Sequence, residues 1–191
     1  MIRIALVGNI ASGKSAVEQV LTSNDFLVLD TDRVAHILLD NNQEVINAFK
    51  DFDILENGKI SREKLGRVVF SSKENKKKLE NILHPQIRQE IFKFFDENSD
   101  KKAVFVAIPL LFEAKMEDLF DKIVFVYTDD KIRLNRLIAR NNYTLEYAKV
   151  RINSQLSQDE KVKKSDIVIF NNSTKEDLEK EVKAKLIEQI R

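Results

Sequence analysis

A short segment near the start of the chain, Gly8-Asn9-Ile10-Ala11-Ser12-Gly13-Lys14-Ser15, has residue types and spacing suited to binding phosphate. It matches the pattern G-x-x-x-x-G-K-[ST] at every fixed position. Glycines permit a tight turn, so that backbone N–H groups converge on phosphate oxygens. The pattern predicts that Lys14 reaches the β- and γ-phosphates of a nucleotide and that the Ser15 hydroxyl binds its Mg²⁺.

Two carboxylates, Asp30 and Asp32, follow the next apolar run, residues 26–29, which predicts a short strand. Ligands of open parallel sheets bind at the carboxyl ends of the strands, so both acids are expected on the same edge as the loop. Strand periodicity predicts that they face the same side. Asp32 suits a general base that accepts a hydroxyl proton during phosphoryl transfer. The alternative is that Asp32 is a helix N-cap.

A third group of candidates lies near the middle of the chain. Arg133, Arg136 and Arg140 have the spacing i, i+3 and i+7, which predicts that they share one helix face. A guanidinium group can donate two hydrogen bonds to one phosphate group. A row of arginines on one helix face would neutralise the charge of a phosphoryl group while it is transferred. The alternative is a solvated face of a surface helix.

The elements that must position these side chains alternate between strand and helix. Short apolar runs predict buried strands, and positions spaced by three or four residues predict helices. The expected strands are residues 2–7, 26–29, 104–108, 123–127 and 167–170, and the expected core helices are residues 13–22, 132–140 and 175–190. Strands separated by helices indicate a parallel sheet covered on both faces. We therefore predict an α/β fold: a P-loop NTPase core with a doubly wound, mostly five-stranded parallel sheet.

Two stretches interrupt this alternation. Residues 33–102 hold no convincing buried strand, and helix-like segments occur near residues 43–49, 61–70, 73–83 and 85–98, with Pro85 suited to a first helical position. We predict a helical insertion there. Residues of about 141–164 are strongly charged with few apolar positions, which is typical of a mobile lid. The prediction is a single domain over residues 1–191 with these two excursions.

The composition limits the classes of function. Of the 191 residues, 43% are hydrophobic and 33% are charged, as in soluble globular proteins. The 32 basic and 31 acidic residues give a net charge of +1, so no global basic field favours nucleic-acid binding. The absence of cysteine excludes disulfides and thiolate metal sites. No apolar run reaches the roughly 18 residues of a membrane span or resembles a signal peptide, so a cytoplasmic location is expected.

The loop alone leaves the type of nucleotide-binding protein open. A GTPase switch needs an Asn-Lys-x-Asp segment, and Asn75-Lys76-Lys77-Lys78 lacks the acid. A motor usually has an acidic residue at the end of a strand, whereas residues 104–108 continue into Pro109-Leu110-Leu111-Phe112-Glu113. Small size, a helical insertion and a charged lid favour a metabolite or nucleoside kinase.

Several segments together resemble the dephospho-CoA kinase family. The most specific are Leu79-Glu80-Asn81-Ile82-Leu83-His84-Pro85-Gln86-Ile87-Arg88 and the segment 108–113, and similarity extends over nearly the whole chain. The resemblance implies an ATP-dependent kinase that phosphorylates the 3′-hydroxyl of the ribose of dephospho-CoA, the last step of coenzyme A synthesis. It implies ATP and dephospho-CoA as ligands and Mg²⁺ as cofactor. No nucleic acid, membrane or obligate protein partner is expected.

The resemblance also implies roles for individual residues. Asp32, Lys14 and Arg140 are the implied catalytic residues, with Asp32 as the base. The implied ATP-binding set is Gly8, Asn9, Ile10, Ala11, Ser12, Gly13, Lys14, Ser15, Ala16, Arg136 and Arg140, in which Ser15 is the metal ligand. The implied acceptor-binding set is Asp32, His84, Arg88, Leu110 and Glu113. From the residues alone, a structural role is favoured for His84 over a role as a ligand, and Glu113 is either functional or a helix cap.

This sequence departs from the family pattern at several positions. Asn9 and Ala11 replace glycines, Ala16 replaces threonine, Arg133 stands where glutamine is common, and Phe170 stands where aspartate is frequent. Asparagine tolerates unusual backbone angles and alanine is small, so the loop is still expected to form. Two other functions remain open, a nucleoside or nucleoside-monophosphate kinase and a nucleotide-binding module without catalysis.

Overall fold

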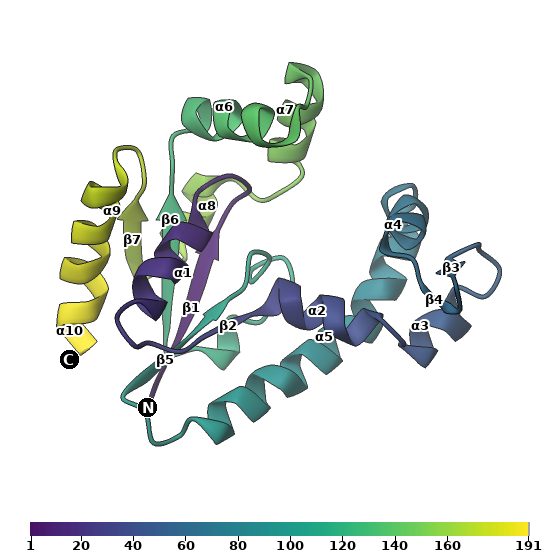
Figure 1. The fold of residues 1–191 in the computed structure, drawn as a ribbon, viewed down its shortest axis with the longest axis horizontal. Helices are drawn as coiled ribbons and strands as arrows, with labels where there is room; N and C mark the ends of the chain where they lie inside the picture. The colour runs from purple at the N-terminus through teal and green to yellow at the C-terminus, as the bar shows by residue number, and fades with distance from the viewer. Residues whose placement is uncertain (191) are drawn as a thin grey trace. The chain divides into compact units, whose positions relative to one another are not determined.

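The fold is organised around a parallel sheet of five strands. A computed structural model describes residues 1–190 of the chain (Figure 1). The strands are β1 (Ile2–Gly8), β2 (Val28–Asp30), β5 (Ala103–Ala107), β6 (Lys122–Tyr127) and β7 (Ile167–Phe170), in the spatial order β2-β5-β1-β6-β7. β1 pairs in parallel with β5 and β6, and β6 pairs in parallel with β7. The predicted α/β fold with a five-stranded parallel sheet is confirmed.

The chain forms two compact units. The first contains Met1–Leu29 and the residues from Asn98 onward, and the second contains Asp30–Glu97. The bounds of the second unit are similar to those of residues 33–102, the stretch in which the sequence interrupts the alternation of strands and helices.

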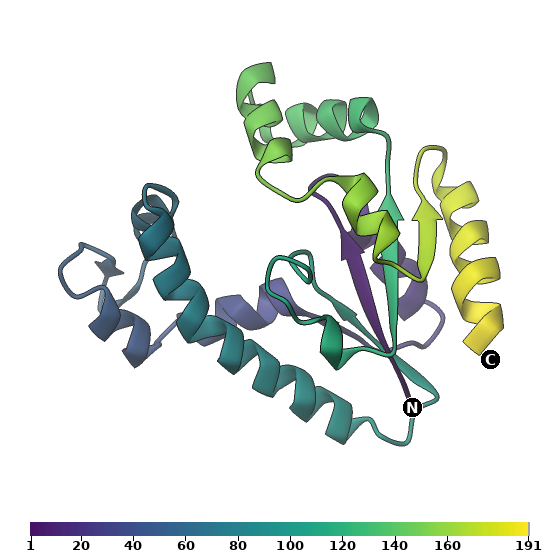
Figure 2. The same cartoon turned by 180° about the vertical axis from the view of Figure 1, so that it is seen from behind.

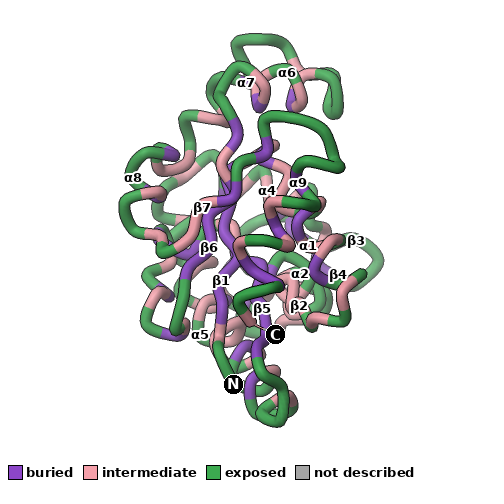
Figure 3. The backbone as a smooth tube through the Cα atoms, turned by 90° about the vertical axis from the view of Figure 1, so that its left-hand side faces the viewer, coloured by how far each residue is buried: buried purple, intermediate pink, exposed green. Residues whose placement is uncertain are grey.

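In the first unit, helices cover both faces of the sheet. The helices α1 (Lys14–Thr22) and α9 (Lys175–Val182) pack on one face, and α8 (Gln158–Lys163) lies behind β6 on the other (Figures 1 and 2). Burial is concentrated along the central strands (Figure 3). The core on the α1 side includes Ile4, Leu6, Val17, Leu21, Phe105, Val124, Val126, Ile169, Leu178, Val182 and Leu186.

The remaining elements of the first unit follow β5 and β6 in the chain. A short 3-10 helix, Glu117–Leu119, precedes β6. The helices α6 (Asp130–Asn141) and α7 (Leu145–Asn153) follow β6 and pack against each other. After α9, the chain continues through a π-helical turn, Lys183–Ile187, into α10 (Glu188–Ile190). The predicted apolar face of this C-terminal helix is confirmed, because Leu178, Val182 and Leu186 are buried.

The second unit is mainly helical. It contains α2 (Thr31–Leu39), α3 (Gln43–Ala48), α4 (Arg62–Phe70) and α5 (Lys73–Glu97), with a hairpin of β3 (Leu55–Glu56) and β4 (Lys59–Ile60). These elements share their own core, formed by Val45, Phe49, Ile54, Ile60, Leu65, Val69 and Leu83. The hairpin was not predicted. Its turn is Asn57-Gly58, with φ of 50° and 76°, the combination that favours a tight hairpin turn.

Two predictions about helix boundaries are wrong. Residues 73–83 and 85–98 were expected as separate helices with Pro85 as a first helical residue, but α5 runs through Pro85 without interruption. Proline removes one backbone donor, and burial of Leu83, Ile91 and Phe95 along α5 outweighs that loss. The long helix α5 carries many charged side chains. Within residues 1–190, no helix combines the length and apolar character needed to cross a membrane.

The second wrong boundary concerns the acidic pair. Asp30, not Asp32, is the N-cap of α2, and its carboxylate accepts a hydrogen bond of 2.9 Å from the Asp32 amide. Because α2 begins at Thr31, Asp32 lies in the first helical turn. The alternation of a strand therefore does not extend from Asp30 to Asp32, and the prediction that they face one side by strand periodicity is wrong.

A bidentate ion pair fastens the start of β1 and predicts acid sensitivity. Arg3 donates to both carboxylate oxygens of Asp121, at 2.7 and 3.1 Å, and this lowers the pKa of Asp121. A carboxyl group with a lowered folded-state pKa stabilises the fold above its unfolded pKa, roughly 3.9, and that stabilisation disappears as the pH falls. We expect Asp121→Asn to reduce stability at pH 7 but to lose less stability than the wild type between pH 5 and pH 3.

Urea unfolding at each pH measures this effect. Asp25→Asn, an exposed position of the same unit, is the matched control and should retain the wild-type pH dependence. An Asp121→Asn variant with the full wild-type loss in acid would contradict the assignment.

Candidate active site

The loop between β1 and α1 depends on its two glycines. Gly13 is the N-cap of α1 and has φ of 85°. A Cβ on Gly13 would lie 2.0 Å from Asn171 Nδ2, and a Cβ on Gly8 would lie 2.5 Å from Ser12 Oγ. A side chain at either position would displace a buried neighbour. Both glycines of the phosphate-binding pattern are therefore required by the packing of this loop.

One residue of the loop has an unusual backbone conformation for its type. Ala11 has φ of 62°, in the left-handed region that disfavours residues with a Cβ. Asn9 is not among the residues with positive φ. The tolerance of asparagine for such angles is therefore not what allows the loop to form here, and alanine occupies the strained position instead.

The first turn of α1 presents the polar groups that the motif predicts. The loop leads directly into the positive end of this helix, and Ser15 is exposed there. The Lys14 ammonium forms an ion pair of 2.5 Å with Glu18, one helical turn further on. Amide donors, an ammonium group and an exposed hydroxyl thus gather at one helix end, which is suited to a phosphate chain with a bound cation.

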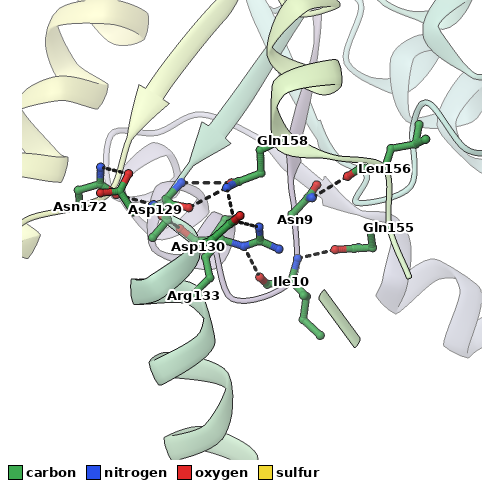
Figure 4. A network of polar contacts seen from close by, with 11 residues as sticks. Asn9, Ile10, Asp129, Asp130, Arg133, Gln155, Leu156, Gln158 and Asn172 are labelled. Carbon is green, nitrogen blue, oxygen red and sulfur yellow. Dashed lines mark hydrogen bonds and ion pairs between the residues drawn. The ribbon is translucent and has the colours of Figure 1, made fainter. Parts of the chain in front are cut away.

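The loop is fastened by polar side chains from distant parts of the first unit (Figure 4). The Ser12 carbonyl accepts hydrogen bonds of 2.8 Å from Thr128 Oγ1 and from Asn171 Nδ2. Asn9 Nδ2 donates to the Leu156 carbonyl at 2.9 Å. Thr128, Asn171 and Leu156 were not predicted as site residues from the sequence. Short-range patterns do not reveal such anchors, because the sheet brings them to the loop.

The three arginines of α6 have different environments. Arg133 is 1% exposed, donates from Nε to the Ile10 carbonyl at 3.0 Å, and forms an ion pair of 2.7 Å with Asp130. Burial lowers the pKa of Arg133, although Asp130 opposes this shift. Arg136 donates to the Asn171 carbonyl, and Arg140 is exposed. The predicted helix over the three arginines is confirmed by α6, but Arg133 is buried against the loop, whereas Arg140 is exposed.

Glu113 forms an ion pair with a buried lysine. Its carboxylate lies 2.8 Å from the Lys161 ammonium, which is 0% exposed, and it also accepts from the Leu156 amide at 3.3 Å. The Lys161 ammonium also donates to the Pro109 carbonyl at 3.4 Å. Glu113 thus connects the segment after β5 with α8, a contact that a helix cap does not describe. Leu110, the other candidate on this segment, is 42% exposed.

A cavity of about 380 Å³ opens beside the loop in the first unit. Its wall combines amide, carboxylate, guanidinium and phenol groups with two apolar side chains. The lining residues are Asn9, Tyr127, Asp130, Arg133, Ile152, Asn153, Gln155, Leu156, Ser157, Gln158 and Asp159. Burial and the neighbouring carboxylates, of which Asp129 has the largest effect, raise the pKa of Tyr127.

The candidates of the second unit lie on α2 and α5. Asp32 is in the first turn of α2, and His84 and Arg88 are one turn apart on α5. Burial lowers the pKa of His84 against the opposing effect of Glu80, so the imidazole is neutral at pH 7. The Arg88 guanidinium lies 6.0 Å from the centre of the Phe92 ring. A cavity of about 500 Å³ on this unit is lined by Glu44, Asn81, Ile82, Pro85, Gln86 and Gln89.

The donor groups fit a nucleotide-bound Mg²⁺ better than a metal site built from protein ligands alone. Within residues 1–190, no group of three or more histidine, aspartate or glutamate side chains is arranged to hold a metal ion. Mg²⁺ in phosphate-transfer sites usually takes one or two protein ligands and completes its shell with phosphate and water. The exposed Ser15 hydroxyl at the start of α1 is suited to such a role.

Comparison with known proteins gives consistent results. Residues 2–177 match the family model described as dephospho-CoA kinase. A dephospho-CoA kinase of Fusobacterium nucleatum subsp. nucleatum is 40% identical over 182 residues, which cover 94% of each chain.

Solved structures agree with the sequence comparison. A crystal structure of a protein from Thermus thermophilus superposes with a TM-score of 0.86 at 34% identity, over 98% of this chain and 97% of that one. The dephospho-CoA kinase of Campylobacter jejuni superposes with a TM-score of 0.77 at 35% identity, over 98% of this chain and 96% of that one.

The packing of Gly13 predicts a sharp effect of a single methyl group. Gly13→Ala combines a positive φ with a Cβ placed against Asn171, so we expect loss of nucleotide binding by at least about tenfold, with destabilisation of roughly 1–3 kcal/mol. Titration with a fluorescent ATP analogue and thermal unfolding measure both effects. Gly66→Ala is the control, because its Cβ would have no contact closer than 3.8 Å. Wild-type binding by Gly13→Ala would contradict the described loop.

The ion pair of Glu113 with the buried Lys161 predicts an effect on stability. Glu113→Ala leaves the Lys161 ammonium buried without its carboxylate, so we expect the free energy of unfolding to fall by about 3 kcal/mol. The double variant Glu113→Ala/Lys161→Met removes both charges and should recover part of that loss. Denaturant unfolding of the two variants tests the assignment, and equal destabilisation of both would contradict it.

Proposed function

Because this chain belongs to the dephospho-CoA kinase family, we propose that its loop from Gly8 to Ala16 binds ATP and that Asp32 activates the acceptor hydroxyl. The protein is an ATP-dependent kinase that phosphorylates the 3′-hydroxyl of the ribose of dephospho-CoA, giving coenzyme A and ADP. One observation best supports the site assignment. Packing requires both glycines of the loop, and the loop ends at the N-terminus of α1.

ATP binding is assigned to groups at the start of α1 and on α6. Backbone amides of residues 13–15 and the Lys14 ammonium hold the phosphate oxygens, and Lys14 exchanges part of its contact with Glu18 for phosphate. Arg136 lies near Gly13, since its Nη1 would be 3.6 Å from a Cβ built there. Arg140, exposed on the last turn of α6, neutralises charge as phosphate transfers. Ser15 would ligate Mg²⁺, which would neutralise the charge that develops on the phosphate groups.

The chemical step requires a base for the acceptor hydroxyl. We assign it to Asp32, whose carboxylate accepts the proton of the 3′-hydroxyl as the oxygen forms a bond to the γ-phosphorus. The bond between the γ-phosphorus and the bridging oxygen breaks, and ADP leaves with that electron pair. The Asp30 cap holds the start of α2 and thereby the backbone from which Asp32 extends.

Acceptor binding is assigned to the remaining candidates. His84 is neutral at pH 7, so it suits a hydrogen bond better than charge neutralisation, whereas Arg88 suits the phosphates of dephospho-CoA. Leu110 offers an exposed apolar contact, and Glu113 supports it by holding the segment to α8. The insertion at about residues 33–102 is the proposed acceptor-binding part, and about 141–164 the lid. We also propose a cytoplasmic location.

A coupled ADP-release assay with Mg-ATP tests the function. Dephospho-CoA is compared with AMP, CMP, adenosine and no acceptor. We expect turnover only with dephospho-CoA and a product heavier by one phosphate. Turnover with a nucleoside monophosphate alone would replace this assignment with a nucleotide kinase, and ATP binding without turnover on any acceptor would indicate a binding module.

Replacement of Asp32 tests the catalytic base. We expect Asp32→Asn to lower kcat by about 10²- to 10⁴-fold, because the hydroxyl loses its proton acceptor, while the Kd for ATP changes less than about twofold. Steady-state kinetics and ATP titration measure the two quantities. Asp40→Asn, an exposed acid just after α2, is the matched control and should retain wild-type kcat. A kcat of Asp32→Asn near that of the wild type would remove Asp32 from the mechanism.

A further inference from the structure

The two peptide groups that flank Ile10 in the phosphate-binding loop are each held by a side chain from another segment. The Ile10 amide donates to Gln155 Oε1 at 2.8 Å, and the Ile10 carbonyl accepts from Arg133 Nε at 3.0 Å (Figure 4). Gln155 follows α7, and Arg133 lies in the first turn of α6. Two segments more than 100 residues away in the chain therefore fix the backbone of Ile10.

The position of this contact matches the strained part of the loop. The Ile10 carbonyl belongs to the peptide that precedes Ala11, the residue with φ of 62°. A rotation of that peptide would return Ala11 to a favourable negative φ and would change the direction of the neighbouring amides. Retention of the carbonyl by Arg133 opposes this rotation. A glycine at position 11 would need no such restraint.

Arg133 is itself held in one orientation. Its Nη1 lies 2.7 Å from Asp130 Oδ1, which also accepts from Gln158 Nε2 at 2.9 Å. Gln158 is held in turn by Thr128, because Gln158 Nε2 also donates to the Thr128 carbonyl at 2.9 Å. Burial of a guanidinium group to 1% exposure is costly. This chain of contacts gives Arg133 a defined geometry under the loop.

We propose that Arg133 and Gln155 are positioning residues that hold the two peptide groups flanking Ile10 and so maintain the loop in the shape that binds ATP. Neither residue contacts the reacting atoms in this proposal. The Ile10 amide is engaged by Gln155 and is not one of the phosphate donors. The inference rests on the proposed function, because it assumes that the loop binds ATP.

The geometry of the arginine side chain allows a precise substitution. In both arginine and glutamine, a nitrogen is attached to Cδ. The Nε2 atom of a glutamine at position 133 can therefore occupy the place of Arg133 Nε and donate to the Ile10 carbonyl. Arg133→Gln keeps this hydrogen bond and removes the ion pair with Asp130, whereas Arg133→Met removes both. The two variants separate the restraint of the loop from the charge.

Steady-state kinetics of the full chain, with ATP and dephospho-CoA varied in turn, test the proposal. We expect Arg133→Met to raise the KM for ATP about tenfold, with less than twofold change in the KM for dephospho-CoA, because a charge-assisted hydrogen bond to the loop is lost. Arg133→Gln should stay within about threefold of the wild type. Gln155→Ala, in a second segment, should raise the KM for ATP in the same direction. Lys131→Met, exposed on the same helix, is the control for loss of a positive charge.

The outcomes separate this proposal from the proposed function. Lys14→Ala with an unchanged KM for ATP would overturn the assignment of the loop as the ATP site, whatever Arg133 does. If Lys14→Ala impairs ATP binding, then a wild-type KM for ATP in both Arg133→Met and Gln155→Ala would overturn the positioning role alone. Arg133→Gln as impaired as Arg133→Met would also overturn it, since charge and not the hydrogen bond would then matter. If Arg133→Met does not fold, Arg133→Gln and Gln155→Ala still decide.

Discussion

A chain that leaves a buried central strand and enters a helix within a few residues has to satisfy its backbone polar groups without a neighbouring strand. In this protein β1 is paired on both sides and ends at Gly8, and α1 begins at Lys14. The intervening carbonyl and amide groups obtain partners from Thr128, Asn171, Arg133 and Gln155. The proposed phosphate site would thus depend on a loop backbone that side chains from outside the loop hold in place.

The same constraint explains why polar residues of the first unit are buried near the loop. Asn9, Ser12, Thr128, Arg133 and Asn171 are all less than 9% exposed. Each polar group removed from water costs free energy unless it is paired, and most of these groups pair with loop backbone. The exceptions are informative, because Ser12 Oγ, Asn9 Oδ1 and Arg133 Nη2 are buried without a hydrogen-bond partner. Such atoms raise the cost of the site and are consistent with selection for function over stability.

In the proposed mechanism, the loop acts together with the residues that we assign to acceptor binding. The helices of the second unit have their own apolar core, which gives His84 and Arg88 a defined scaffold. The ion pair of Glu113 and Lys161 ties the segment after β5 to α8, and α8 begins with Gln158, the residue that orients Asp130. In the first unit, α8 therefore contacts both Glu113, a candidate for acceptor binding, and Asp130, the partner of Arg133 beside the loop.

The sequence by itself determined the features that depend on local chemistry. The loop pattern, the five apolar runs and the C-terminal helix were predictable, because glycine freedom, strand burial and helical spacing are short-range properties. Helix boundaries at Asp30 and Pro85 were missed, since capping and packing compete there with local preference. Only the tertiary structure decided that Arg133 lies under Ile10, that Glu113 pairs with Lys161 and that Asn171 excludes a side chain at Gly13. These contacts join residues 48 to 158 positions apart, and only the order of strands in the sheet brings them together.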